Sequence, residues 1–96
     1  MASYKLAPLA DADLVNIANK TIDDWGYKQA KVYLQAIDTA LNTLAQTPAI
    51  GKPRPEVYKN ARSFPVEKHI VYYQQSNDGI EVARILHQRM DPSKHF

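Results

Sequence analysis

The last third of the chain alternates between apolar and polar positions with the period of β-strands. Segments 62–66, 69–73 and 80–87 are rich in Val, Ile, Tyr and Phe, which favour a pleated, half-buried surface. Asp78-Gly79 is typical of a tight hairpin turn. The third segment has apolar residues at both its odd and its even positions, so we expect a central strand covered on both faces. Its apolar residues are Ile80, Val82 and Leu86 on one side and Ala83 and Ile85 on the other.

The first half of the chain begins with a short alternating segment and continues with the period of helices. Residues 4–8 predict a strand that ends at Pro8, because proline cannot donate to a sheet ladder. Residues 9–24 and 27–46 predict two helices, separated by Gly26. The second helix has an apolar seam at spacings of four, three, four and three residues: Ala30, Leu34, Ile37, Leu41 and Leu44.

Two helices joined by so short a connection form an antiparallel hairpin that can pack on one face of a sheet. Trp25 continues the apolar stripe of the first helix, so we expect it to anchor the core. Asp11 and Asp13 suit the first turn of that helix, where carboxylates meet the positive end of the helix dipole.

Two further segments have no clear periodicity. Residues 47–60 contain three prolines and predict a loop without regular structure, either a crossover or a functional loop. Residues 91–96 form a polar tail that ends in Phe96, and this tail either frays or docks through that ring.

The expected fold is therefore α+β, with the order β-α-α-β-β-β in a small, mostly antiparallel sheet. The first strand needs a neighbour, and the third strand of the C-terminal meander is the natural one. The helix hairpin covers one sheet face and nothing else in the chain remains to cover the other. An uncovered apolar sheet face usually binds a partner, so we expect function there.

Composition narrows the class of protein. Ninety-six residues suffice for one domain with a modest core, residues 1–96. No apolar run approaches the roughly 20 residues of a membrane span, and we expect no secretory signal at the N-terminus. The absence of cysteine excludes disulfides and thiolate chemistry and suits a cytosolic protein. The net charge is −1 over residues 1–50 and +3 over residues 51–96, a weak indication of an anionic partner.

Candidate catalytic chemistry is sparse. The three histidines are scattered in sequence and do not predict a metal site, and we expect no cofactor. A histidine with arginines can cleave RNA without a metal ion, because arginine stabilises the dianionic transition state. The alternative is that Arg62 and Arg84 pair with Glu56, Glu67 or Glu81 and that His87 caps the sheet edge. The basic candidates are Lys52, Arg54, Arg62, Arg84, His87 and Arg89.

The order and spacing of several motifs resemble the ParE toxins of bacterial type II toxin–antitoxin modules, within the RelE/ParE superfamily. The resemblance covers essentially the whole chain, and no single tetrapeptide decides it. The motifs are Trp25-Gly26, Tyr33-Leu34, Pro48-x-x-Gly51, Arg62-Ser63-Phe64-Pro65-Val66, His69-Ile70-Val71-x-Tyr73 and Arg84-Ile85-Leu86-His87-x-x-Met90-Asp91.

This resemblance implies a cytoplasmic toxin that inhibits DNA gyrase by binding, without chemistry of its own, and that a ParD-like antitoxin neutralises. It implies no direct DNA binding by the toxin alone and no membrane partner. The antitoxin would lay an amphipathic segment across the helix hairpin and sheet. Expected antitoxin contacts are Trp25, Tyr33 and Tyr73. Expected target contacts are Arg84, His87, Arg89, Lys94 and Phe96.

Two alternatives remain open on sequence alone. RelE-like relatives are ribosome-dependent mRNA endoribonucleases, and in that case Arg62, Arg84 and His87 would be the catalytic candidates. A net charge of only +2 and the Phe-Pro-Val and Leu-His-x-x-Met-Asp signatures favour the ParE branch. A toxin-like domain that has lost activity and only binds its antitoxin is the second alternative.

Overall fold

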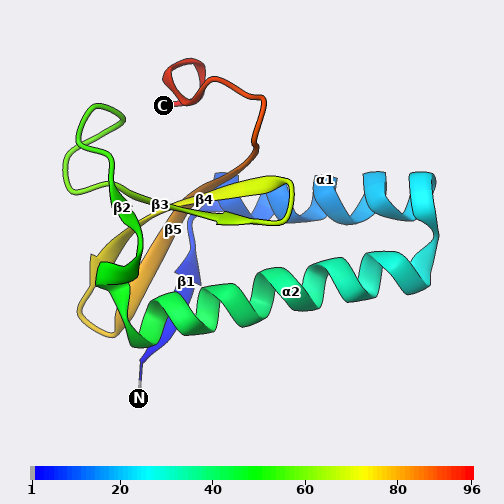
Figure 1. Cartoon of the computed structure of the whole chain (residues 1–96), viewed down its shortest axis with the longest axis horizontal. Helices are drawn as coiled ribbons and strands as arrows, with labels where there is room; N and C mark the ends of the chain where they lie inside the picture. The colour runs from blue at the N-terminus through cyan, green and yellow to red at the C-terminus, as the bar shows by residue number, and fades with distance from the viewer. Residues whose placement is uncertain (1) are drawn as a thin grey trace.

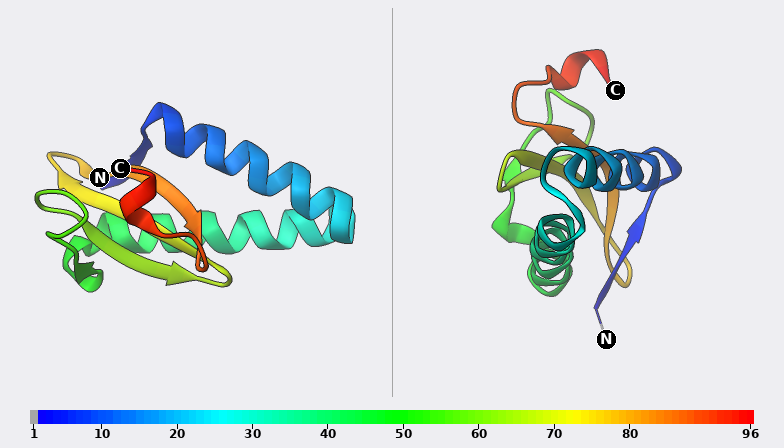
Figure 2. Two further views of the ribbon diagram at one scale, coloured as in Figure 1. Left: turned by 90° about the horizontal axis from the view of Figure 1, so that it is seen from above. Right: turned by 90° about the vertical axis from the view of Figure 1, so that its right-hand side faces the viewer.

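The computed structural model describes residues 2–96, which form two helices against one face of a five-stranded sheet (Figures 1 and 2). The order along the chain confirms the expected α+β arrangement. The elements are β1 (Ser3–Leu6), α1 (Pro8–Trp25), α2 (Tyr27–Gln46), η1 (Pro48–Ile50), β2 (Lys52–Pro53), β3 (Arg62–Val66), β4 (His69–Ser76), β5 (Gly79–His87) and η2 (Pro92–Lys94).

The sheet has the strand order β1-β5-β4-β3-β2, and it is mixed. β1 pairs with β5, the neighbour that the sequence predicted. This pair is parallel, and the other three pairs are antiparallel. β5 is an interior strand because it is flanked by β1 and β4, although β4 is the middle strand.

A β-bulge changes the face pattern expected for β5. Tyr72 is opposite Arg84 and Tyr73 is opposite Val82, so Ala83 is the extra residue on β5. Strict alternation would place Ile85 on the other face from Ile80 and Val82, and that expectation is wrong. Ile85 joins both residues in the core cluster beneath the helices.

The helix hairpin buries its seam against the sheet, but it is longer than the sheet is wide. Figure 1 shows α1 and α2 side by side, with their connection at Gly26 extending well beyond the strands. Gly26 has φ +89°, a conformation that favours glycine. Trp25 stands at this free end with 72% of its surface exposed, so its predicted role as a core anchor is wrong. Trp25 continues the apolar stripe of α1, but this end of the helix extends beyond the strands.

The segment after α2 is more regular than expected. Residues 48–50 form the 3₁₀ helix η1, and Lys52–Pro53 form β2, a two-residue strand that pairs with Ser63 and Arg62. The prediction of a loop without regular structure is therefore wrong. The prolines remain compatible with this structure because β2 is an edge strand.

The second sheet face, expected to be open, is partly covered by the chain itself. The Phe96 ring lies against Tyr58 and Tyr72, with ring centroids 5.3 and 5.5 Å apart respectively. Figures 1 and 2 both place residues 91–96, here called the C-terminal tail, on the opposite side of the sheet from α2. The tail docks, and the expectation that nothing covers this face is wrong.

Candidate functional site

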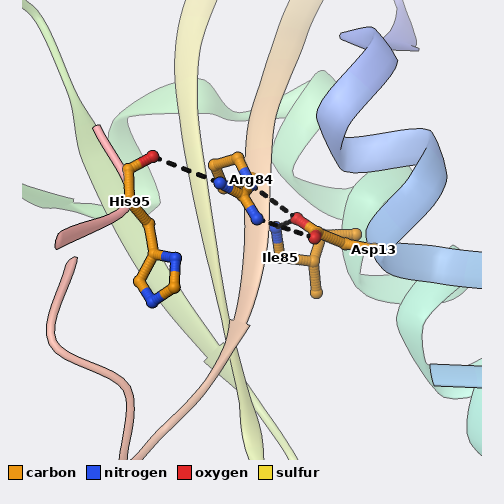
Figure 3. Close-up of polar contacts among 4 residues, drawn as sticks. All are labelled: Asp13, Arg84, Ile85 and His95. Carbon is orange, nitrogen blue, oxygen red and sulfur yellow. Dashed lines mark hydrogen bonds and ion pairs between the residues drawn. The ribbon is translucent and has the colours of Figure 1, made fainter. Parts of the chain in front are cut away.

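The C-terminal tail is held by a polar network centred on Arg84 (Figure 3). The Asp13 carboxylate accepts from Arg84 Nε at 2.9 Å and from Arg84 Nη2 at 2.9 Å. Arg84 Nη1 donates to the carbonyl oxygen of His95 at 3.2 Å. Hydrogen bonding to Asp13 is the main cause that raises the pKa of Arg84. One guanidinium therefore links α1, β5 and the tail.

The local structure explains why this network forms at this point. β1 ends at Leu6, and its last backbone contact with β5 is Ala7 N–H to the Val82 carbonyl at 2.9 Å. β5 continues to His87, so beyond Val82 its edge lacks a neighbouring strand. The Asp13 carboxylate takes that place and accepts the Ile85 N–H at 2.9 Å. Asp13 thus satisfies a backbone donor that would otherwise be unpaired at a partly buried edge.

The tail itself is a short, internally bonded turn. The Asp91 carboxylate caps η2 by accepting from Ser93 N at 3.0 Å and from Ser93 Oγ at 2.8 Å. These hydrogen bonds are the main reason that the pKa of Asp91 lies below its usual value. Phe96 remains 45% exposed at the end of the turn. The tail therefore offers a fixed but accessible aromatic group.

Tyr58 completes the aromatic cluster under the tail. Burial, followed by the negative charge of Glu81, raises the pKa of Tyr58 to about 12. Its hydroxyl is buried and has no hydrogen-bond partner among residues 2–96. The cluster of Tyr58, Tyr72 and Phe96 thus contains one unsatisfied polar atom, which weakens it relative to an apolar cluster of the same size.

Tyr33, His69 and His87 form a second cluster, between α2 and the ends of β4 and β5. Tyr33 Oη accepts from Lys68 N at 3.1 Å and lies 2.6 Å from His69 Nδ1. The His69 and His87 rings are 5.3 Å apart, because these residues are directly opposite each other in the β4–β5 register. Burial and then the neighbouring His87 lower the pKa of His69. His69 therefore takes up a proton at a lower pH than a free histidine does.

Tyr73 does not lie where the antitoxin prediction requires it. It is 0% exposed, and its hydroxyl accepts from Gly51 N at 2.9 Å and donates to the Pro48 carbonyl at 2.7 Å. Burial raises the pKa of this hydroxyl. The predicted contact between Tyr73 and a partner is wrong. The alternation along β4 separates the two faces of the strand, but it does not show which face packs against the helices.

The arginines make other contacts than the expected glutamate pairs. Arg62 Nη1 donates to the Gly51 carbonyl at 2.6 Å and to the Ala49 carbonyl at 3.3 Å. Arg84 pairs with Asp13, and Glu56 pairs with Arg54 at 3.6 Å. The expected pairing of Arg62 and Arg84 with glutamates is therefore wrong.

The three candidate catalytic residues of the nuclease alternative do not converge. Arg62 begins β3 and is opposite Tyr73, which is opposite Val82. His87 is at the other end of these strands, in register with His69. His87 instead lies beside His69 and accepts from Arg89 N at 3.2 Å. The guanidinium groups of Arg62 and Arg84 are both committed to contacts within the chain.

A second accessible surface lies between the helices. An apolar groove of about 290 Å³ opens between α1 and α2 beside β1. The Tyr4 hydroxyl closes one side by donating to Asp38 at 2.5 Å, and burial with this carboxylate raises the pKa of Tyr4 to about 12. Val15 on the groove is 54% exposed. The lining residues are Tyr4, Leu14, Val15, Ala18, Leu34, Ile37, Asp38 and Leu41.

Of the predicted site residues, the structure brings Arg84 and Phe96 together around the tail, while Arg89 and Lys94 are exposed nearby in sequence. His87 belongs to the histidine cluster, and Trp25 lies at the hairpin end, where Tyr27 is also exposed. Sequence reasoning missed Asp13, which it assigned only to the first turn of the helix. That placement is wrong, because α1 begins at Pro8 and only Asp11 is an acidic residue of the first turn. Within residues 2–96 no group of three or more histidine or acidic side chains could hold a metal ion, and no helix could span a membrane.

Comparisons with known proteins identify the family of the chain. Residues 4–92 match the family model of the ParE toxin of type II toxin–antitoxin systems, parDE. The chain is 37% identical over 94 residues to Toxin ParE1 of Mycobacterium tuberculosis, covering 97% of this chain and 96% of that protein. It is 30% identical over 96 residues to Toxin ParE1 of Caulobacter vibrioides, covering 100% and 99%. A solved structure from a chromosomal ParDE TA system of P. aeruginosa superposes with a TM-score of 0.76 at 25% identity, covering 91% of this chain and 96% of that one.

Proposed function

Because the chain belongs to the ParE family of toxins of type II toxin–antitoxin systems, we propose that it inhibits DNA gyrase by binding and that a ParD-like antitoxin neutralises it. The observation that carries the proposal is the family match over nearly the whole chain. We propose that the toxin and its antitoxin are cytoplasmic, because gyrase acts in the cytoplasm. The inhibition requires no chemistry by the toxin.

The C-terminal tail and the strand end beside it form the proposed surface for gyrase. Arg89, Lys94 and Phe96 are exposed and chemically suited to a protein interface, since arginines and aromatic residues dominate binding energy at such surfaces. Arg84 supports this surface through the His95 carbonyl, and we no longer expect its guanidinium to reach the target. His87 stays a proposed contact, but its ring lies beside His69.

The groove between α1 and α2 is the proposed surface for the antitoxin. Its lining is mostly apolar and comes from two neighbouring helices, which suits apolar side chains on one face of an amphipathic helix. Trp25 and Tyr33 stay proposed antitoxin contacts. We expect Trp25 to contribute more to binding, because it is exposed at the hairpin end. The groove lining and the C-terminal tail share no residue, so each can be altered without the other. Tyr33 and His87 are left unchanged in such tests, because both belong to the cluster around His69.

The decisive experiment compares gyrase supercoiling with in vitro translation at the same concentrations of purified toxin. Inhibited supercoiling with unaffected translation supports the proposal. Arrested translation with cleaved mRNA would overturn it in favour of the nuclease alternative, and no effect in either assay would indicate an inactive toxin. Truncation after Met90 is expected to abolish gyrase inhibition and to leave antitoxin affinity within about tenfold, because the tail makes few contacts with the core.

The antitoxin surface has its own matched pair of variants. Val15→Glu places a charge in the apolar groove and is expected to weaken antitoxin binding by at least about tenfold. Lys20→Glu, on the same helix but outside the groove lining, is the control and is expected to change affinity little. Equal effects of both variants would contradict the assignment of the groove.

A further inference from the structure

The connection between Asp13 and the tail suggests a role for a residue whose side chain is mostly buried. The Asp13 side chain is only 13% exposed and the Arg84 side chain 15% exposed. They are 71 residues apart in sequence and meet at the edge of β5. Their contact is made by two parallel N–H···O bonds, which fixes the plane of the guanidinium as well as its position.

Fixing that plane also fixes the direction of the remaining donor. With Nε and Nη2 both bound to Asp13, Nη1 points at the His95 carbonyl (Figure 3). Within residues 2–96 this is the one hydrogen bond that joins the C-terminal tail to the sheet. The second attachment is the Phe96 ring, which lies against Tyr58 and Tyr72. The tail is thus attached at two neighbouring residues: at His95 through Arg84, and at Phe96 through the aromatic rings.

We infer that Asp13 is a positioning residue for the C-terminal tail, and that it sets the conformation in which the tail meets the target. Asp13 orients Arg84, Arg84 holds the His95 carbonyl, and this hydrogen bond places Phe96 and Lys94. The inference rests on the proposed function, in which the tail contacts gyrase. Loss of the Asp13 charge leaves the helix and sheet in place but frees the guanidinium to turn, so the tail detaches.

The test requires a variant that removes the charge without removing the side chain. Asp13→Asn keeps an oxygen that can accept the Ile85 N–H, but it loses the paired carboxylate that orients Arg84. Asp11→Asn is the matched control, because Asp11 is on the same helix, is exposed, and has no side-chain hydrogen bond among the described residues. Arg84→Lys is a second variant that keeps the positive charge and loses the two-point contact.

Tail docking can be measured without any target. The chain has two phenylalanines, so 4-fluorophenylalanine gives one ¹⁹F signal for Phe96 and one for Phe64, which packs against the core and reports on folding. A synthetic peptide of residues 88–96 gives the undocked position of the Phe96 signal. Asp13→Asn and Arg84→Lys are expected to move the Phe96 signal toward that position, with Phe64 unchanged and Asp11→Asn like wild type.

Function is then read from the same proteins. In Asp13→Asn the toxin concentration for half-inhibition of gyrase is expected to rise about tenfold, the usual effect of losing a charged hydrogen bond, with antitoxin affinity within about threefold. A docked Phe96 in both variants would overturn the inference. The inference would also be overturned if the wild-type toxin inhibits gyrase and the variants, with an undocked tail, inhibit it equally well. If wild type does not inhibit gyrase, the proposed target fails while the ¹⁹F result still decides whether Asp13 positions the tail.

Discussion

The role of Tyr73 leads to a quantitative prediction for Tyr73→Phe. The substitution removes one oxygen atom and keeps the ring that fills the core. That oxygen accepts from Gly51 N and donates to the Pro48 carbonyl, so it joins β4 to the segment that follows α2. Without it, the Gly51 N–H is left unpaired in a buried position.

The expected cost follows from the two groups that lose their partner. A buried donor without a partner costs about 1–3 kcal/mol, and the partly buried Pro48 carbonyl adds about 1 kcal/mol. The free energy of unfolding is therefore expected to fall by about 2–4 kcal/mol. Arg62 still holds the Gly51 and Ala49 carbonyls, so the segment stays attached and the protein stays folded.

Urea unfolding followed by far-ultraviolet circular dichroism is the appropriate assay. The fluorescence of Trp25 is a poor probe, because this residue is already exposed in the folded state. For an m-value of roughly 1–2 kcal/mol/M, the loss lowers the midpoint by at least about 1 M. Antitoxin affinity at low urea is expected to equal that of wild type, since Tyr73 has no exposed surface.

Tyr72→Phe is the matched control on the adjacent position of the same strand. In the part of the chain that the structure describes, the Tyr72 hydroxyl has no hydrogen-bond partner, so its loss is expected to change the free energy of unfolding by less than about 0.5 kcal/mol. A Tyr73→Phe variant as stable as Tyr72→Phe would refute the reasoning. Weakened antitoxin binding by a stable Tyr73→Phe protein would restore Tyr73 as a contact residue.

Three further predictions concern pH, the hairpin end and the β1–β5 contact. The pKa of His69 is lower in the folded state than in the unfolded chain. As the pH falls below about 6.5, the unfolded chain therefore binds more protons than the folded protein does. The stability that is present above this pH is lost as the pH falls toward the pKa of His69 in the folded protein. Unfolding midpoints between pH 7.5 and 5 should fall less in His69→Gln than in wild type; equal slopes would contradict this. Trp25→Ala is expected to change the free energy of unfolding by less than about 0.5 kcal/mol, because the side chain is exposed. The same variant is expected to bind the antitoxin about tenfold more weakly, as measured by calorimetry. Unchanged affinity would remove Trp25 from the antitoxin surface. Gly79→Ala is expected to raise hydrogen exchange in β1, because a Cβ there collides with the Ser3 carbonyl oxygen while φ +143° disfavours alanine; protected β1 amides would refute it.

The sequence by itself determined both long helices, four of the five strands and the neighbour of the first strand. Spacings of three and four placed the buried seam of α2, and its predicted bounds, residues 27–46, are those observed. The need of a lone first strand for a partner placed β1 beside β5. The order and spacing of motifs from Trp25-Gly26 to Met90-Asp91 indicated the ParE family, which the family model confirms. These inferences succeed because periodicity and chain connectivity are local properties of the sequence.

Only the tertiary structure decided which side chains are buried, exposed or joined. Trp25 follows the helical stripe, yet it is exposed because the hairpin is longer than the sheet that it covers. One bulged residue, Ala83, moved Ile85 to the face beneath the helices. Asp13 and Arg84 meet across 71 residues, at an edge that exists because β1 ends before β5 does. Such contacts depend on the relative lengths and registers of packed elements, and no spacing within a single element records them.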